Sequence, residues 1–150
     1  MNLTLVELFY RPPKEDYPEY YYVTPGGYSF FGYVTFIARI ILIPGRDEKF
    51  DEMPNGQKRY FSHLMTHKEE LLKDASKMEK FQLIYEDLQD IVSLKNKLPT
   101  QSEVLDIYGK IIVNAMGLET ETNIRVGSAL FLSGSVIDHS CVPNVIWSYR

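Results

Sequence analysis

Cysteine, surplus positive charge and long apolar runs are all scarce in this sequence of 150 residues. The single cysteine, Cys141, excludes a disulfide within the chain, and such sparing use of cysteine is typical of reducing compartments. The formal net charge of −4 leaves no excess of Lys and Arg to follow a phosphate backbone. We therefore expect neither a disulfide-stabilised scaffold nor a protein that binds nucleic acid directly.

The sequence also lacks segments that direct a chain to or across a membrane. Its most apolar stretch, residues 28–43, contains Gly32 and Arg39 and is shorter than the roughly 20 residues of a spanning helix. Residues 1–4 show no positive region followed by an apolar core, so no secretory signal is expected. We expect no membrane association and a location in the cytoplasm, the nucleus or both.

The composition that is present suits one folded domain. Hydrophobic residues make up 45% and charged residues 24%, close to the averages of soluble globular proteins. Seven of the eleven tyrosines fall in residues 1–33, with prolines and glycines that favour short extended pieces and turns. The tyrosines at 20–22 would suit base stacking, but their acidic neighbours favour ordinary packing. The chain thus divides into a tyrosine-rich segment of unknown role, residues 1–33, and a domain over residues 34–150.

Apolar spacing of three and four residues predicts helices over much of that domain. The first covers residues 34–43 and ends at Pro44, although a run this apolar is also compatible with a buried strand. Residues 44–56 are polar, contain an Asn-Gly pair and are expected to form a surface loop. A second helix is expected from residue 60 to about residue 74.

Two later helices carry the signature of a capping box, in which a Ser or Thr and a Glu three residues on satisfy free backbone N–H groups. Ser76 with Glu79 predicts the start of one helix, and an apolar series at helical spacing follows it. Thr100 with Glu103 predicts the start of another, which we expect to end at Gly117.

The helical period stops beyond Gly117. Residues 124–137 are small, apolar and rich in glycine, which indicates short strands and turns, and residues 145–149 indicate a further strand. Helices first and short strands last predict the α+β class.

Two pairs of side chains suggest chemistry when judged by spacing alone. His63 and His67 are four apart, which on a helix directs two imidazoles toward one metal, but Leu64 stands where a zinc protease has glutamate. Two surface histidines are the better interpretation. His139 and Cys141 are a base and a thiol, yet one intervening loop residue rarely aims two such side chains at each other. Taken alone, Cys141 is better interpreted as a small buried side chain.

The most informative segment is residues 138–144, Asp-His-Ser-Cys-Val-Pro-Asn. It is similar to the Asn-His-Ser-Cys-x-Pro-Asn signature of the SET domain in SET-and-MYND-type (SMYD) protein-lysine methyltransferases, with Asp138 in place of the first asparagine. Other short matches occur in the family's order and approximate spacing and extend the resemblance over residues 34–150. They lie at residues 37–41, 62–64, 113–114 and 127–129.

This resemblance implies an incomplete SET domain, with a helical insert region followed by short SET-type β-strands. Family members transfer a methyl group from S-adenosylmethionine to the ε-amine of a lysine, and no metal takes part in that reaction. The implied partner is a lysine-containing protein, with a histone as one family-level candidate. Six residues match positions that line the cofactor in the family: His63, Asn114, Ser135, Ile137, Asp138 and His139.

The resemblance gives Cys141 a different role. In the family this cysteine joins three cysteines of a downstream segment to bind a structural zinc ion. Tetrahedral zinc needs four ligands. We therefore expect zinc at Cys141 only in a longer chain that supplies the other three cysteines.

Departures from the family pattern limit what the resemblance implies. An ionised Asp138 only accepts hydrogen bonds, whereas asparagine also donates them. Phe61 replaces a glutamate that often holds the ribose hydroxyls of the cofactor. The tyrosine that shapes the family's methyl-transfer pore follows the strand expected at residues 145–149, so no catalytic residue is assigned. We predict that the isolated chain is inactive. A second hypothesis is that it is a degenerate SET-like module that binds proteins without cofactor chemistry.

Overall fold

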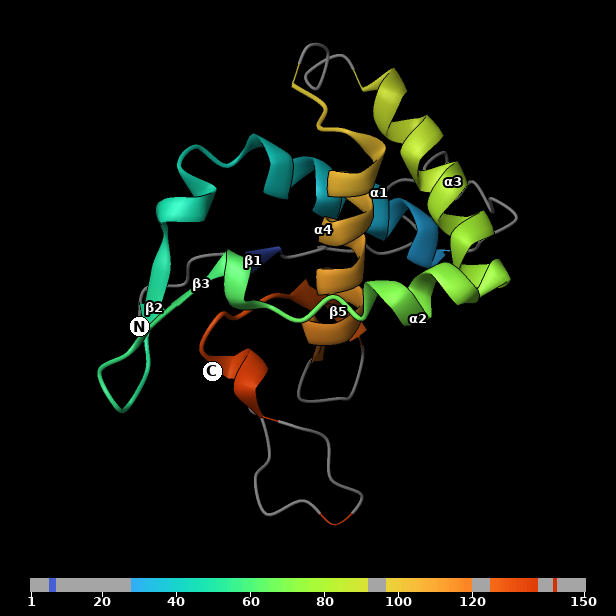
Figure 1. Cartoon of the computed structure of the whole chain (residues 1–150). Coiled ribbons are helices and arrows are strands. Elements are labelled where there is room, and N and C mark those ends of the chain that lie inside the picture. Colours follow the sequence, from blue (N-terminus) through green and yellow to red (C-terminus); the bar gives the residue numbers. More distant parts are fainter. Residues whose placement is uncertain (1–5, 8–27, 92–96, 120–124, 138–141, 143–150) are drawn as a thin grey trace, which may run out of the picture.

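The computed structural model describes residues 6–7, 28–91, 97–119, 125–137 and 142. Within them the chain forms helices and two small antiparallel sheets, which confirms the α+β class (Figure 1). The helices are α1 (Tyr28–Leu42), α2 (Lys68–Lys73), α3 (Ala75–Asp90) and α4 (Gln101–Asn114). One sheet has the order β1-β5-β4, with β1 at Val6–Glu7, β4 at Met116–Glu119 and β5 at Arg125–Ala129. The other pairs β2 (Phe50–Glu52) with β3 (Lys58–Tyr60).

The four helices enclose an apolar core. Helices α1 and α2 each contact α3 and α4, and α3 contacts α4. Removing these side chains from water is the main favourable contribution to folding. Leu130 and Leu132 join the core, so the segment after β5 is anchored to the helices. The largest fully buried side chains are Tyr108, Phe81, Ile37, Ile40, Ile84, Leu88, Leu130, Leu132 and Val104.

Helix α1 explains why its sequence was ambiguous between helix and strand. It is buried on most sides, because it lies between α3 and α4, and its exposed positions between residues 34 and 40 are Thr35 and Arg39. A helix buried all round has no wide polar stripe to mark its period. The helix prediction is confirmed. The helix begins at Tyr28 rather than Val34, however, and Gly32 lies within it.

The capping boxes had different outcomes. Thr100 and Glu103 cap α4 reciprocally, as predicted. The Ser76 box is wrong, because Asp74 is the N-cap of α3 and its Oδ1 accepts a hydrogen bond from the Lys77 N–H at 3.1 Å. Aspartate caps as well as serine does. Because α2 ends at Lys73, the chain must turn there, and that turn selects Asp74.

The predicted end of α4 at Gly117 is also wrong. The helix ends at Asn114, Ala115 is already extended, and Gly117 lies inside β4. Strand β4 pairs antiparallel with β5, with Gly117 opposite Ser128. Pairing with the next strand therefore determines where the helix stops.

The single helix predicted over residues 60–74 does not form. A 3-10 turn, η3 (Phe61–His63), follows β3, an irregular stretch comes next, and only Lys68–Lys73 is helical. Phe61, Leu64 and Leu71 are all buried, but they reach the core from three different local structures. His67 has φ 46°, a left-handed conformation that interrupts any continuous helix.

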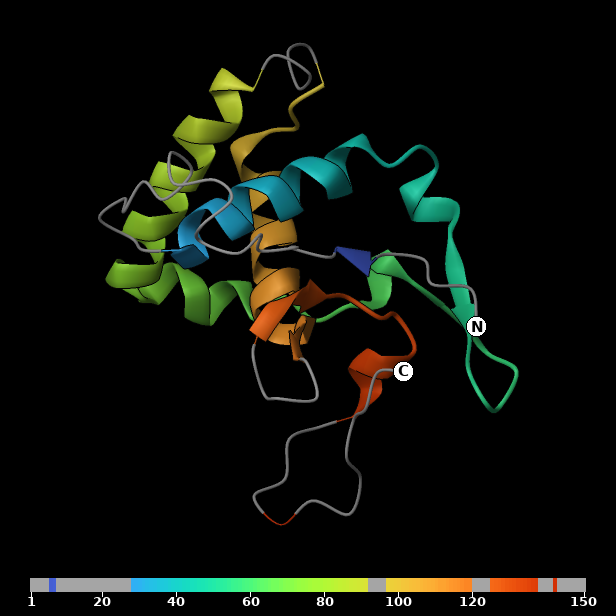
Figure 2. The same cartoon turned by 180° about the vertical axis from the view of Figure 1, so that it is seen from behind.

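The polar loop predicted over residues 44–56 contains regular structure instead. A 3-10 turn, η2 (Arg46–Glu48), leads into β2, and β2 and β3 form a hairpin that projects from one side of the helices (Figures 1 and 2). Asn55-Gly56 lies at its turn, with Gly56 at φ +78°. Asn-Gly between two extended runs is a hairpin signal. These strands were missed because each is only three residues long and mostly polar.

Short strands and turns between residues 124 and 137 are confirmed by β5 and by the 3-10 turn η5 (Gly134–Val136). The strand predicted at residues 145–149 lies outside the described residues, and the division of the chain at residue 33 stays a prediction. Among the helices that are described, none has the length and apolar character needed to cross a bilayer.

Candidate functional site

Four of the six residues assigned to the cofactor lie in the described part of the chain. They are His63, Asn114, Ser135 and Ile137. Asp138 and His139 lie outside the described residues, as does the zinc ligand expected at Cys141. The described part of the candidate site therefore consists of its helical side and η5.

Asn114 ends α4 and is only 6% exposed. Its Nδ2 donates two hydrogen bonds, one to the Met65 carbonyl at 2.8 Å and one to the Lys110 carbonyl at 2.7 Å. The first bond attaches the irregular stretch after η3 to the end of α4, and the second lies within α4. Within the described residues, no hydrogen-bond donor is found for the Asn114 Oδ1.

His63 ends η3 and is exposed. Its Nδ1 accepts a hydrogen bond from the Tyr60 backbone N–H at 3.4 Å, and its ring meets the Tyr60 ring edge-on at a centroid distance of 5.3 Å. The second ring nitrogen is left to face solvent or a ligand. His67 is also exposed, and it lies 3.8 Å from Glu70 rather than next to His63. The two histidines are surface side chains, as the sequence analysis favoured.

Ser135 lies within η5 and has two hydrogen-bond partners. Its Oγ–H donates to the Leu132 carbonyl at 2.8 Å, and its Oγ accepts from the Arg59 Nε–H at 3.2 Å. Ile137 follows η5 and is 46% exposed. Its large apolar side chain therefore faces outward at the point where the described residues end before Asp138.

One short stretch connects these residues in space. Arg59 in β3 contacts Ser135, His63 lies in the turn that follows, and the Met65 carbonyl contacts Asn114. Residues 59–65 therefore run from η5 to the end of α4, with His63 between the two contacts. The structure brings three of the predicted cofactor residues to one strip of the molecule, although they are far apart in sequence.

Phe61 is the position where the family often has glutamate, and two cations lie close to its ring. The Lys110 Nζ lies 4.6 Å and the Arg46 Cζ 5.1 Å from the centroid of this buried ring. The face of an aromatic ring attracts such cations. Lys110 is itself buried and pairs with Asp106 at 3.2 Å.

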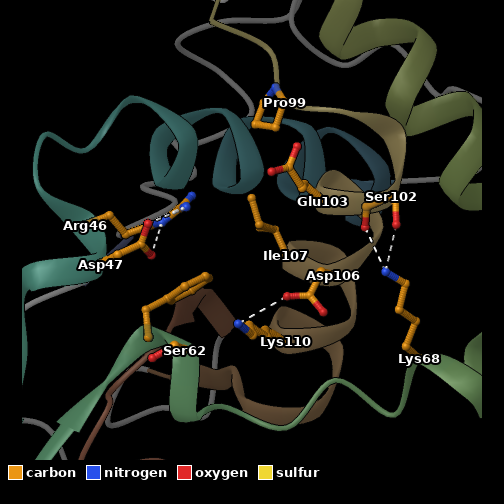
Figure 3. Close-up of a pocket in the computed structure, with 11 residues that line it drawn as sticks. Arg46, Asp47, Ser62, Lys68, Pro99, Ser102, Glu103, Asp106, Ile107 and Lys110 are labelled. Atoms are coloured by element: carbon orange, nitrogen blue, oxygen red, sulfur yellow. Dashed lines mark hydrogen bonds and ion pairs between the residues drawn. The ribbon is translucent and has the colours of Figure 1, made fainter.

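An open pocket of about 320 Å³ lies beside α4, and it is lined by Arg46, Phe61, Asp106 and Lys110 among others (Figure 3). On one side of it, the Lys68 Nζ donates hydrogen bonds to the backbone carbonyl and the hydroxyl of Ser102, both at 3.0 Å. The Arg46 guanidinium donates two hydrogen bonds to Asp47 and lowers the pKa of that carboxyl. Sequence reasoning did not single out this pocket. The only signal was the spacing of Asp106 and Lys110, four apart on one helix face.

Comparison with known proteins gives a partial match to one group of enzymes. No family model matches the chain. The N-lysine methyltransferase SMYD2 of Rattus norvegicus is 31% identical over 75 residues, which are 48% of this chain and 17% of that protein. The human SMYD2 is 29% identical over a stretch of the same length. SMYD2-A of Danio rerio is 26% identical over 117 residues, 78% of this chain and 26% of its own length. The chain thus covers about a quarter or less of these relatives, and over that part it is similar to SMYD2 lysine methyltransferases.

Proposed function

We propose that this chain is part of a SET-domain protein-lysine methyltransferase of the SMYD family. The proposed cofactor is S-adenosylmethionine, and the proposed substrate is a lysine of a protein, with a histone as one candidate. The observation that carries the proposal is Asn114, a buried side chain with an open acceptor at a position that resembles a cofactor-lining position of the family. The similarity to SMYD2 enzymes supports it.

The polar atoms of the described site fit such a cofactor. S-adenosylmethionine carries an adenine amine and an ammonium, both of which donate hydrogen bonds, and Asn114 Oδ1 is a buried acceptor. A buried acceptor left without a donor costs about 1–3 kcal/mol, so binding a donor there is favourable. His63 and Ser135 would contribute further polar contacts, and Ile137 an apolar one.

The chemistry that the cofactor supplies when bound is a methyl group on sulfur, open to attack by a neutral amine. The contribution of this chain is to hold polar groups in fixed positions around that centre, because catalysis of such a transfer rests on alignment and desolvation. Asn114 is fixed by two hydrogen bonds and Ser135 by two more. Both side chains are therefore set before a ligand arrives, which lowers the entropic cost of binding.

A second candidate function is a SET-like protein-binding module without cofactor chemistry. Phe61 favours it, because an apolar ring close to two cations offers no acceptor for ribose hydroxyls. Asp138 favours it as well, because an ionised carboxylate cannot donate a hydrogen bond. Under either function we propose a location in the cytoplasm, the nucleus or both, and zinc at Cys141 only where a longer chain supplies three further cysteines.

Titration calorimetry of the full chain with S-adenosylmethionine tests the choice. The methyltransferase proposal expects saturable heat below millimolar cofactor. His63→Ala should weaken binding about three- to tenfold, the loss of roughly one hydrogen bond, with little change in melting temperature. Ser62→Ala is the matched control, since Ser62 is the exposed neighbour in the same turn. A folded chain that gives no heat at millimolar cofactor would exclude a cofactor site in this chain and favour the binding module.

A substitution at position 138 that should strengthen cofactor binding also distinguishes the methyltransferase from the binding module. Asp138→Asn restores the donor of the family signature, so it should strengthen cofactor binding by about tenfold, the contribution of one hydrogen bond to a charged or polar ligand. The measurement is the same calorimetric titration. Unchanged affinity in a chain that binds the cofactor would show that position 138 makes no such contact.

A further inference from the structure

The β2–β3 hairpin makes two side-chain contacts with the segment that carries Ser135. Asp51 in β2 and Arg59 in β3 face each other across the hairpin as register partners. The Asp51 Oδ2 accepts hydrogen bonds from the Ser133 backbone N–H at 3.0 Å and from the Ser133 hydroxyl at 3.2 Å. The Arg59 Nε–H donates to the Ser135 hydroxyl at 3.2 Å. Two partners in one cross-strand pair therefore hold two serines of one turn.

This geometry follows from the hairpin itself. Directly opposed residues of an antiparallel pair point to the same face of the sheet. Asp51 and Arg59 are half-buried on that face, whereas their neighbours Glu52 and Lys58 are exposed. The hairpin thus directs one carboxylate and one guanidinium toward η5 and keeps its other charges in solvent.

Within the described residues, the other hydrogen bonds of the turn that they hold are local, among them those from the Ser135 N–H to the Phe131 carbonyl at 3.0 Å and from the Ser135 hydroxyl to the Leu132 carbonyl at 2.8 Å. A single 3-10 turn such as η5 has poor hydrogen-bond geometry and is weak in isolation. Its first residues follow the buried Leu130 and Leu132, but Val136 and Ile137 are 44% and 46% exposed. Apolar packing therefore anchors only the start of this segment. The polar contacts to Ser133 and Ser135 determine where its later part lies.

We propose that Asp51 and Arg59 are positioning residues that hold residues 133–137 in the conformation that receives the cofactor. The hairpin acts as a clamp on this segment, defined as the contacts of Asp51 with Ser133 and of Arg59 with Ser135. The effect on the cofactor rests on the proposed function. The effect on the segment itself does not.

Two measurements on the full chain test the clamp. The first is amide hydrogen exchange of a peptide covering residues 131–137. Asp51→Ala and Arg59→Ala should each speed exchange in this peptide by about five- to twentyfold, the loss of one or two hydrogen bonds, while peptides of α3 and α4 keep the wild-type rate. The second is cofactor affinity by calorimetry, which should fall about five- to twentyfold in the same variants.

Matched variants distinguish positioning from general damage. Asp51→Asn keeps a carbonyl oxygen for the Ser133 N–H, so it should restore most of the wild-type exchange and affinity. Glu52→Gln alters the exposed neighbour in the same strand and should change neither. Rescue by asparagine together with a silent control would show that the contact matters, rather than the charge of the hairpin.

The outcomes are separable from those of the proposed function. If the wild-type chain binds no cofactor, the proposed cofactor site in this chain fails, while faster exchange confined to residues 131–137 still supports the clamp. If exchange in that peptide is the same in Asp51→Ala as in Glu52→Gln, the clamp is wrong. Equal acceleration across α3, α4 and residues 131–137 would also overturn it, because the contact would then belong to the global fold.

Discussion

The four helices pack through buried apolar side chains, whereas the edge formed by β2, β3 and η5 is held by individual polar contacts. In the helices, Ile84 and Leu88 of α3 are fully buried. At the edge, Phe50 and Val136 are exposed, and Asp51 and Arg59 supply the contacts to η5. Apolar burial contributes more free energy per side chain than one hydrogen bond does. Damage to the helices should therefore unfold the chain, and damage to the edge should displace a site in a folded chain.

The largest effect that tests this contrast is expected at Leu88. Its side chain is 0% exposed, so Leu88→Ala should lower the free energy of unfolding by about 2–5 kcal/mol through lost burial and a cavity. Urea denaturation followed by circular dichroism measures it. Leu83→Ala is the control, because Leu83 is on the same helix but 45% exposed and should cost well under about 1 kcal/mol. Equal losses in both variants would mean that the buried face of α3 is assigned wrongly.

A somewhat smaller effect is expected at Gly109, where the helices meet the stretch before α2. A Cβ at this position would lie 2.6 Å from the Thr66 carbonyl oxygen. Gly109→Ala should therefore destabilise by about 1–3 kcal/mol, although helix propensity alone predicts a gain of about 1 kcal/mol. The sign of the change in the free energy of unfolding, measured by the same urea denaturation, shows whether the close contact or helix propensity dominates.

Gly56→Ala provides the comparison for that result. A Cβ at Gly56 meets nothing within 4 Å, but φ is +78°, so only backbone strain opposes the substitution. The expected cost is about 1 kcal/mol.

A stabilised Gly109→Ala variant would show that α4 is not packed closely on Thr66.

Alkaline pH tests the helical core through Tyr108. Burial raises the pKa of this hydroxyl to about 12 from its ordinary value of 10.0, because the charged form is disfavoured there. The folded chain keeps this proton to a higher pH than the unfolded chain does. The free energy of unfolding therefore keeps its full value below pH 10 and falls as the pH rises toward 12. The loss should reach up to about 2.5 kcal/mol.

Tyr108→Phe should remove this part of the alkaline loss of stability. Melting temperatures between pH 9 and 11.5 for the two chains provide the comparison. The phenyl ring retains the contacts of Tyr108 with Tyr33 and Phe81, so stability at neutral pH should change little. Parallel pH profiles in the two chains would show that this hydroxyl is not in a desolvated position.

The smallest effect is expected at His67, in the irregular stretch between the two regions. Its left-handed φ of 46° disfavours any side chain, so His67→Gly should stabilise the chain by about 0.5–1 kcal/mol. His67→Ala keeps a Cβ and should give no gain. Thermal unfolding of both variants checks the prediction, and a stabilised alanine variant would contradict the role of backbone strain.

Sequence reasoning succeeded where local pattern and tertiary packing agree. The apolar series of α3 and the Thr100 cap of α4 are local features, and both are found in the structure. It failed over residues 60–74, where Phe61, Leu64 and Leu71 show helical spacing but become buried from a turn, an irregular stretch and a short helix. Spacing records which side chains are apolar and says nothing about the backbone between them.

The candidate site shows the same division. His63 and Asn114 were named from the sequence, but nothing local indicates that residues 59–65 run between η5 and the end of α4. The contacts that produce this arrangement join Asn114 to Met65, Arg59 to Ser135 and Asp51 to Ser133. The first crosses 49 positions of the chain, the second 76 and the third 82.

By itself the sequence determined most of the helical core and the α+β class, because burial periodicity and capping act over a few residues. Only the tertiary structure decided where α4 ends, that residues 50–60 form a hairpin, and that Asp51 and Arg59 hold η5. These features depend on strand pairing and on hydrogen bonds between distant residues, whose free energy exists only after the chain has brought its partners together.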